Sequence, residues 1–155
     1  MFSTPDFDST VEHRTLPDLP RDISVTSIEA AKKVSKQWGE ERWLVHGDAP
    51  FVMKIIHLKA GTRTSLQFHR YKEEANLVVS GRARLHFRSG EGRGETCELG
   101  PGVVIHIGSG AVHRVEALTD VTMIEVSTPE VDDVVRLSDD WNRPDGRIDS
   151  EHLQP

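Results

Sequence analysis

The sequence predicts an all-β protein, a barrel or sandwich built from short antiparallel strands. Eight runs of β-branched, aromatic and alternating apolar residues fit strands, at 51–58, 64–69, 76–81, 83–88, 97–99, 103–107, 113–118 and 121–127. Segments rich in Gly and Asp, such as "SGR", "LGPG" and "LTD", separate these runs and suit tight turns. Turns spaced by about 8–12 residues are typical of antiparallel double-sheet folds. Internal repeats are absent, which excludes a solenoid.

The two ends of the chain differ from this pattern. Residues 1–24 contain proline and scattered Asp without periodicity, so we predict an arm that is disordered or packed on a partner. The next segment, 26–37, offers a Thr26/Glu29 capping box and good helix formers, which predicts a short helix ended by Gly39. After Thr128 we expect one acidic helical turn in "EVDDVVRL". The predicted organisation is therefore one domain over 25–143, followed by a tail over 144–155.

Composition excludes several classes of protein. The 155 residues fit one domain, and 36% hydrophobic with 28% charged residues is typical of a soluble globular chain. The longest apolar runs are too short to span a bilayer, and the acidic ends and net charge of −6 disfavour nucleic acid as a partner. The N-terminus lacks the pattern of a secretory signal, and Cys97 has no second cysteine to pair with, so we predict a cytoplasmic protein.

Four polar residues at unusual spacings are candidate metal ligands. Gln67 and His69 point to one side of a strand because side chains alternate. Glu74 should return beside His69 on the next strand, and His113 opens a strand after the turn "GSGAV". Each of them alone is more commonly a solvated or locally hydrogen-bonded side chain, so the hypothesis depends on the set. Two imidazoles, a carboxylate and an amide oxygen suit one divalent ion such as Zn, Fe, Mn or Ni.

The spacing of these residues resembles the two motifs of the cupin superfamily. The first reads Gly61-x5-Gln67-x-His69-x4-Glu74-x6-Gly81, and the second reads Gly102-x7-Gly110-x2-His113. Gln67 stands where the common pattern has His, and Gly108 stands where Pro is usual. With "SLQFH", the Trp38-Gly39 pair and "VSTPEVDDVVRL", residues 34–143 are similar to stand-alone cupins related to the C-terminal domain of type II mannose-6-phosphate isomerases.

This resemblance implies a fold, a ligand set and an activity. The fold is a double-stranded β-helix, or jelly-roll barrel, with short peripheral helical turns. The implied metal ligands are Gln67, His69, Glu74 and His113, and Lys54 matches a lysine that recurs before the first motif. The Trp38-Gly39 pair is expected to pack at the start of the barrel. Small cupin barrels also commonly pair or exchange an N-terminal arm, so we predict a homodimer.

The predicted function is isomerisation of a small sugar or sugar phosphate by metal-assisted proton transfer. Lys54 and His106 are the candidate acid–base residues, with His57 as a further candidate. The candidate phosphate-binding residues are Arg63, Arg70 and Lys72. Each also has the simpler interpretation of a solvated or packed side chain. Arg114, directly after His113, should face away from the metal.

Two other functions fit the same residues. His69, Glu74 and His113 form a two-His, one-carboxylate set, which with iron would suit a dioxygenase. A metal-bearing or sugar-binding cupin without turnover would use the same cavity. The metal and the requirement for dioxygen distinguish these alternatives.

Overall fold

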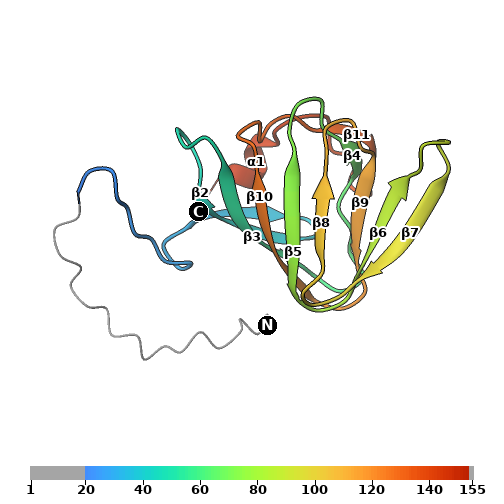
Figure 1. Cartoon of the computed structure of the whole chain (residues 1–155), viewed down its shortest axis with the longest axis horizontal. Coiled ribbons are helices and arrows are strands. Elements are labelled where there is room, and N and C mark those ends of the chain that lie inside the picture. The colour runs from blue at the N-terminus through green and yellow to red at the C-terminus, as the bar shows by residue number, and fades with distance from the viewer. Residues whose placement is uncertain (1–19, 154–155) are drawn as a thin grey trace.

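The computed structural model describes residues 20–153, which form two antiparallel β-sheets packed face to face (Figure 1). The first sheet has six strands, in the order β1 (Lys32–Lys36), β2 (Gly39–Val45), β3 (Val52–Leu58), β10 (Val121–Ser127), β5 (Glu74–Ser80) and β8 (Val104–Ile107). The second has five, in the order β11 (Val135–Ser138), β4 (Leu66–Phe68), β9 (His113–Ala117), β6 (Ala83–Arg88) and β7 (Gly94–Leu99). One short helix, α1 (Asp149–His152), is described. The predicted all-β class is confirmed.

Strand register divides the interior into an apolar half and a polar half. On β10 and β3, Met123 lies opposite Ile56, and both side chains belong to the core. Two residues further along β10, Glu125 lies opposite Lys54 on one side and Asn76 of β5 on the other. All of these side chains are buried. A shift of register by one residue would turn this polar row to the outside.

The apolar half is the hydrophobic core. Both sheets contribute to it, through Trp38, Ile56, Leu58, Val78, Ala83, Leu99, Val115, Ala117, Val121 and Met123. Burying a large apolar side chain stabilises a fold by about 1.5–3 kcal/mol. Trp38 packs in this core, as the sequence predicts. The core therefore stabilises one end of the barrel, and the buried polar side chains lie at the other end.

The helix predicted over residues 26–37 is wrong. Residues 32–36 form β1, which pairs along its whole length with β2, and Val34 is fully buried. The preceding residues make turns, in which the Ser27 hydroxyl accepts a hydrogen bond from the Ala30 amide. A helix of this length is marginal by itself, so pairing with a neighbouring strand overrides its helix propensity.

The C-terminal residues also differ from the prediction. The segment "EVDDVVRL" makes a tight turn and then enters β11 instead of a helical turn. The expected tail over 144–155 packs on the barrel as far as residue 153, because Glu151 of α1 pairs with Lys36 at 2.7 Å and with Arg143 at 3.0 Å. Most of the predicted N-terminal arm, residues 1–19, lies outside the described residues. No helix within residues 20–153 has the length and apolar character needed to cross a bilayer.

Candidate metal centre

Three of the predicted ligands meet inside the polar half of the barrel. His69 follows β4, Glu74 opens β5 and His113 opens β9, and all three are buried. One potential ligand atom of each lies within 4.8 Å of those of the other two. The Nε2 atoms of His69 and His113 are each 3.5 Å from a different oxygen of the Glu74 carboxylate. Strands from both sheets therefore bring two imidazoles to one carboxylate.

Hydrogen bonds fix which nitrogen of each imidazole is free. The Nδ1 of His69 donates to the carbonyl oxygen of Asp133, and the Nδ1 of His113 donates to that of Ala111 at 2.9 Å. A carbonyl oxygen can only accept, so Nδ1 carries the proton and Nε2 of the neutral ring presents a lone pair. His69 Nε2 is buried and has no hydrogen-bond partner among residues 20–153.

The lone pairs of the two Nε2 atoms repel the oxygens of Glu74 unless a cation lies between them. Backbone carbonyls that hold Nδ1 in this way are the usual partners of metal-binding histidines. A divalent ion bound by two imidazoles and a carboxylate therefore fits these residues.

Gln67, the fourth predicted ligand, lies beside the three. It is the register partner of His113 across β4 and β9, and its side chain lines the same cavity. Its amide oxygen accepts a hydrogen bond from the Ser65 hydroxyl at 2.5 Å. That oxygen has a second lone pair, so the bond leaves it able to bind a metal. Its role as a ligand stays a prediction.

Asp133 holds the loop that carries His69, and sequence analysis missed it. Its carboxylate accepts hydrogen bonds from the backbone N–H groups of Arg70, Tyr71 and Lys72, at 3.1, 2.6 and 3.0 Å. Partial burial raises the pKa of Asp133, but these three N–H groups lower it by more. Its carbonyl oxygen meanwhile orients His69. The signal is present in "EVDDVVRL", which the sequence analysis interprets as an acidic helical turn and as part of the family resemblance.

A chain of alternating charges runs from the metal centre across the cavity. Lys72 was predicted at the rim, but it is only 4% exposed and contacts both Glu74 and Glu125. Lys54 lies 3.5 Å from Glu125 and 3.5 Å from Glu41. Residues in a loop have no fixed alternation, so the sequence did not reveal that Lys72 turns inward. Lys54 lines the cavity.

These contacts keep the buried groups charged. Burial raises the pKa of Glu41, but the Lys54 and Lys36 ammonium groups and a hydrogen bond from Trp43 lower it by more, to about 2. Burial also raises the pKa of Glu74, but the Lys72 ammonium holds it well below its ordinary value. Burial lowers the pKa of Lys72, but Glu125 and Glu74 raise it by more. The cavity therefore contains ionised carboxylates and ammonium groups in close contact.

Three other predicted site residues lie outside the cavity. Arg63 pairs with Asp140 at 2.7 Å on the surface, and the side chain of Arg70 is exposed. The side chain of His106 is 67% exposed and lies 3.4 Å from Glu73, because Ile107 and Ile105 take the inward positions of β8. Neither arginine nor His106 lines the cavity that contains the metal centre.

The cavity itself has a volume of about 110 Å³. By the same measure one water needs about 10–15 Å³, so there is room for a small polar ligand. The segment after β11 forms part of its wall, through Arg143, Arg147, Ile148 and His152. This contribution was missed, since these residues were predicted as the end of the domain and a tail. Arg114 points out of the cavity, as predicted, and its guanidinium donates to the Thr64 carbonyl.

The family of this chain follows from its similarity to known sequences. The family described as "Mannose-6-phosphate isomerase C-terminal" matches residues 24–139. The chain belongs to this family. The mannose-1-phosphate guanylyltransferase ManC of Salmonella typhimurium is 33% identical over 117 residues, and the mannose-1-phosphate guanylyltransferase of Escherichia coli is 32% identical over 117 residues. Each match covers 72% of this chain but only 23% of the relative, so the chain spans about a quarter of the length of these proteins.

Solved structures of cupins share the fold of this family member. The capsular polysaccharide assembling protein CapF of Staphylococcus aureus matches with a TM-score of 0.58 and 22% identity, over 69% of this chain and 34% of CapF. Oxalate decarboxylase of Bacillus subtilis matches with a TM-score of 0.63 and 20% identity, over 72% of this chain and 31% of the decarboxylase. A structure of the same decarboxylase, from a study of its Mn(II) centres, matches with a TM-score of 0.61 and 16% identity, over 71% of this chain and 31% of the decarboxylase. The predicted cupin barrel is confirmed.

Replacing Asp133 tests whether it supports the metal centre of this cupin. In Asp133→Ala three N–H groups of the ligand loop lose their acceptor, so we expect metal affinity to fall by about 10–100-fold while the barrel stays folded. Titration with a competing chelator measures the affinity. Asp132→Ala is the matched control, because the Asp132 carboxylate does not bond to this loop. Equal affinity in the two variants would remove the supporting role.

The lowered pKa of Glu41 predicts how stability depends on pH. A carboxyl whose pKa is about 2 in the folded protein and 4.5 ordinarily stabilises the fold above pH 4.5, and this contribution is lost as the pH falls toward 2. Between pH 4.5 and pH 2, we expect the free energy of unfolding to fall less in Glu41→Gln than in the wild type, with a difference of at most about 3 kcal/mol. Urea unfolding at each pH measures it. The exposed Glu130→Gln should behave like the wild type, and an unchanged profile in Glu41→Gln would contradict the assignment.

Proposed function

We propose that this chain is a metal-dependent cupin that isomerises a small sugar or sugar phosphate by proton transfer between neighbouring carbons. The observation that carries the proposal is one cavity that contains both the His69–Glu74–His113 centre and the charged pairs of Lys54. Membership of the mannose-6-phosphate isomerase C-terminal family supports this substrate class. The donor set suits Zn, Fe, Mn or Ni.

The chemistry divides between the metal and the ion pairs. A divalent ion held by His69, Glu74 and His113, with Gln67 as fourth ligand, would supply Lewis acidity toward a carbonyl and its neighbouring hydroxyl. Lys54 is the proposed acid–base residue. Its ammonium lines the cavity between Glu41 and Glu125, from where it can give a proton to a substrate and take one back.

Packing keeps the proposed acid–base group in position. Lys54 Nζ lies 4.6 Å from the centre of the Trp43 ring, whose Nε1 donates to Glu41 at 2.6 Å. The group is therefore restrained from two sides at the wall of the cavity that contains the metal centre. His106 has no place in this proposal because its side chain lies on the outer face of β8.

The three-residue centre also fits the alternatives that the sequence left open. Two histidines and one carboxylate are the ligands of non-haem Fe(II) oxygenases. A cupin that binds a sugar without turnover needs only the cavity.

A cytoplasmic location also stays a prediction.

Activity and metal content together test the proposal. We expect the metal-loaded protein to interconvert aldose and ketose phosphates without dioxygen. His69→Ala and His113→Ala should lose both metal and activity. Lys54→Gln should keep the metal but lose about 10²–10⁴-fold in kcat, which is the usual contribution of an acid–base group. His106→Ala is the matched control and should keep both.

Two results would contradict the isomerase. One is iron-dependent consumption of dioxygen with a substrate, which would identify an oxygenase. The other is full metal occupancy in both histidine variants, which would remove the centre itself.

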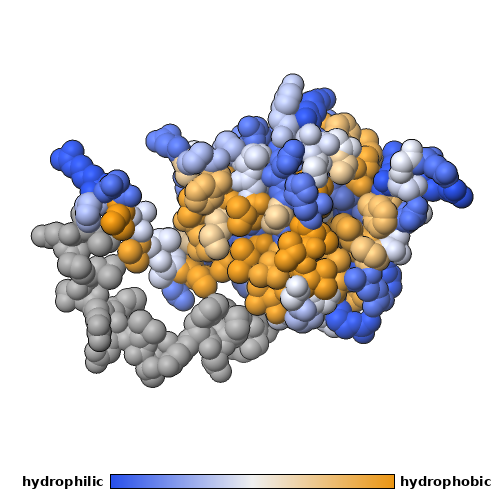
Figure 2. Space-filling model, in the orientation of Figure 1, coloured by the Kyte–Doolittle hydropathy of each residue, from blue (hydrophilic) through white to orange (hydrophobic). Residues whose placement is uncertain are grey.

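We also propose that the chain forms a homodimer through the outer face of its six-stranded sheet. Apolar side chains gather on this face (Figure 2), among them the exposed Phe51, Val104 and Val126. Two copies related by a twofold axis would each cover the apolar face of the other. We expect a dimeric mass by light scattering, and a monomeric mass for Val126→Glu. Leu137→Glu, on β11 of the other sheet, should remain dimeric, and a monomeric wild type would contradict the proposal.

A further inference from the structure

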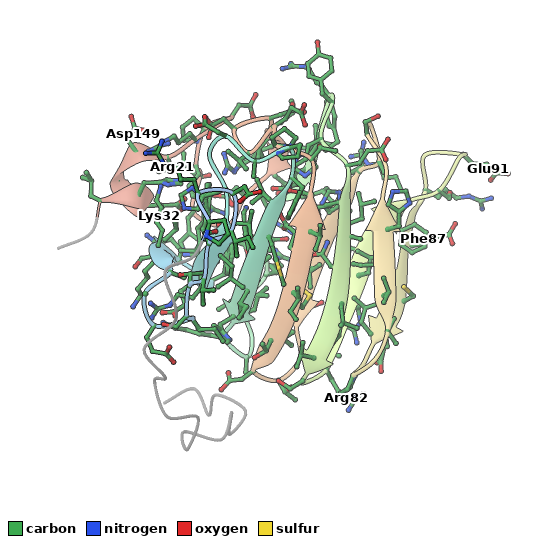
Figure 3. All side chains as sticks on the ribbon, turned by 60° about the vertical axis from the view of Figure 1, so that its left-hand side comes forward. Arg21, Lys32, Arg82, Phe87, Glu91 and Asp149 are labelled. Atoms are coloured by element: carbon green, nitrogen blue, oxygen red, sulfur yellow. The ribbon has the colours of Figure 1, made fainter. Side chains whose placement is uncertain are left out.

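A second group of polar side chains lines the cavity at the end that the C-terminal residues form. We call Arg136, Arg143, Arg147 and His152 the C-terminal wall; all four line the cavity that contains the metal centre. Lys36 of β1 lines the same end. Figure 3 shows that Lys32 on β1 and Asp149 on α1 lie on the same side of the molecule. The wall therefore combines two segments that are far apart in the sequence.

Two buried polar atoms of the wall have no partner. The structure contains three buried side-chain nitrogen or oxygen atoms without a hydrogen-bond partner among residues 20–153: His69 Nε2, Arg136 Nε and His152 Nδ1. All three residues line this one cavity. A buried polar group without a partner is costly, and in a native protein it points to a bound water, ion or ligand or to a catalytic role. A metal would satisfy His69, which leaves Arg136 Nε and His152 Nδ1 able to bind a second group in the cavity.

Charge at the wall indicates what that group is. The guanidinium of Arg136 donates to the carbonyl oxygens of Pro144 and Gly146 instead of pairing with a carboxylate. Burial lowers its pKa, and the charge of Arg143 lowers it further. Burial lowers the pKa of His152, as do the nearby cations Arg147, Lys36 and Lys32. Positive charge at this end is therefore unfavourable until an anion binds.

Three carboxylates near the wall are already engaged. Glu151 accepts from Lys36 and Arg143, and Asp139 accepts from Arg143 at 2.7 Å. Asp145 accepts from the backbone N–H of Arg136 at 2.7 Å. These bonds fix the wall in place. They leave Arg136 Nε and His152 Nδ1 available at the cavity.

We propose that the C-terminal wall is an anion subsite that binds a phosphoryl group through Arg136 and His152. This deepens the proposed function, on which it rests, by placing the phosphate of the substrate in the same cavity as the metal centre, with Arg136 of β11 paired to Gln67 of β4. The C-terminal wall takes the phosphate-binding role that the sequence predicts for Arg63 and Arg70. Arg143, Arg147 and His152 lie beyond residues 24–139, which the family match covers. The cavity volume of about 110 Å³ suits a small ligand such as a sugar phosphate.

Calorimetric titration of the metal-loaded full chain tests the subsite. The probes are inorganic phosphate, a hexose 6-phosphate and the same hexose without phosphate. We expect saturable binding of phosphate, and binding of the hexose phosphate at least about 10-fold tighter than of the free hexose. Arg136→Gln should weaken the binding of both phosphate ligands by about 10-fold or more and leave the affinity for the free hexose unchanged. Arg70→Gln is the matched control and should bind all three as the wild type does.

Further variants separate this inference from the isomerase. Because Arg136 also holds the backbone of residues 144–146, His152→Gln provides a second test if Arg136→Gln fails to fold. His69→Ala, without metal or activity, should still bind inorganic phosphate. Phosphate binding that is absent from the wild type, or unchanged in every folded variant of Arg136 and His152, would overturn the subsite. An inactive wild type that binds phosphate at the wall would overturn only the isomerase.

Discussion

The buried carboxylate of Glu74 is the constraint on which the polar half of the barrel depends. A charge enclosed in this way is unstable unless opposite charge and hydrogen bonds surround it. Lys72 supplies one contact, and the Nε2 atoms of His69 and His113 face its two oxygens. The imidazoles are held in the tautomer that offers lone pairs, so they increase the need for a cation. A metal ion would satisfy the carboxylate and both rings at once.

Strand geometry makes such a site compatible with a stable protein. The same strands carry apolar side chains at one end and ionisable ones at the other, so a single core supports both. On β10, Met123 belongs to the core while Glu125, on the same face, contacts Lys54 and Lys72. Rigid pairing between strands then fixes the positions of the charged groups. This is the preorganisation that binding and catalysis require.

The C-terminal residues complete the cavity that the barrel opens. Asp133 orients the ligand loop from outside the two motifs, and the segment beyond β11 adds arginines to the cavity wall. Ion pairs of Glu151 fasten α1 to β1, so closure depends on contacts between the two ends of the described chain. The same residues thus contribute to stability and to the composition of the cavity.

The sequence by itself determined the class of fold, most central strands and the residues of the metal centre. These features follow local rules: alternation along a strand, glycine in turns and the spacing of ligands in neighbouring strands. Only the tertiary structure decided that residues 32–36 form a strand, that Lys72 turns inward and that His106 turns outward. It also decided that the C-terminal wall lines the cavity that contains the metal centre. These outcomes depend on pairing and packing between distant residues, because a short segment or a loop has no local preference strong enough to fix them.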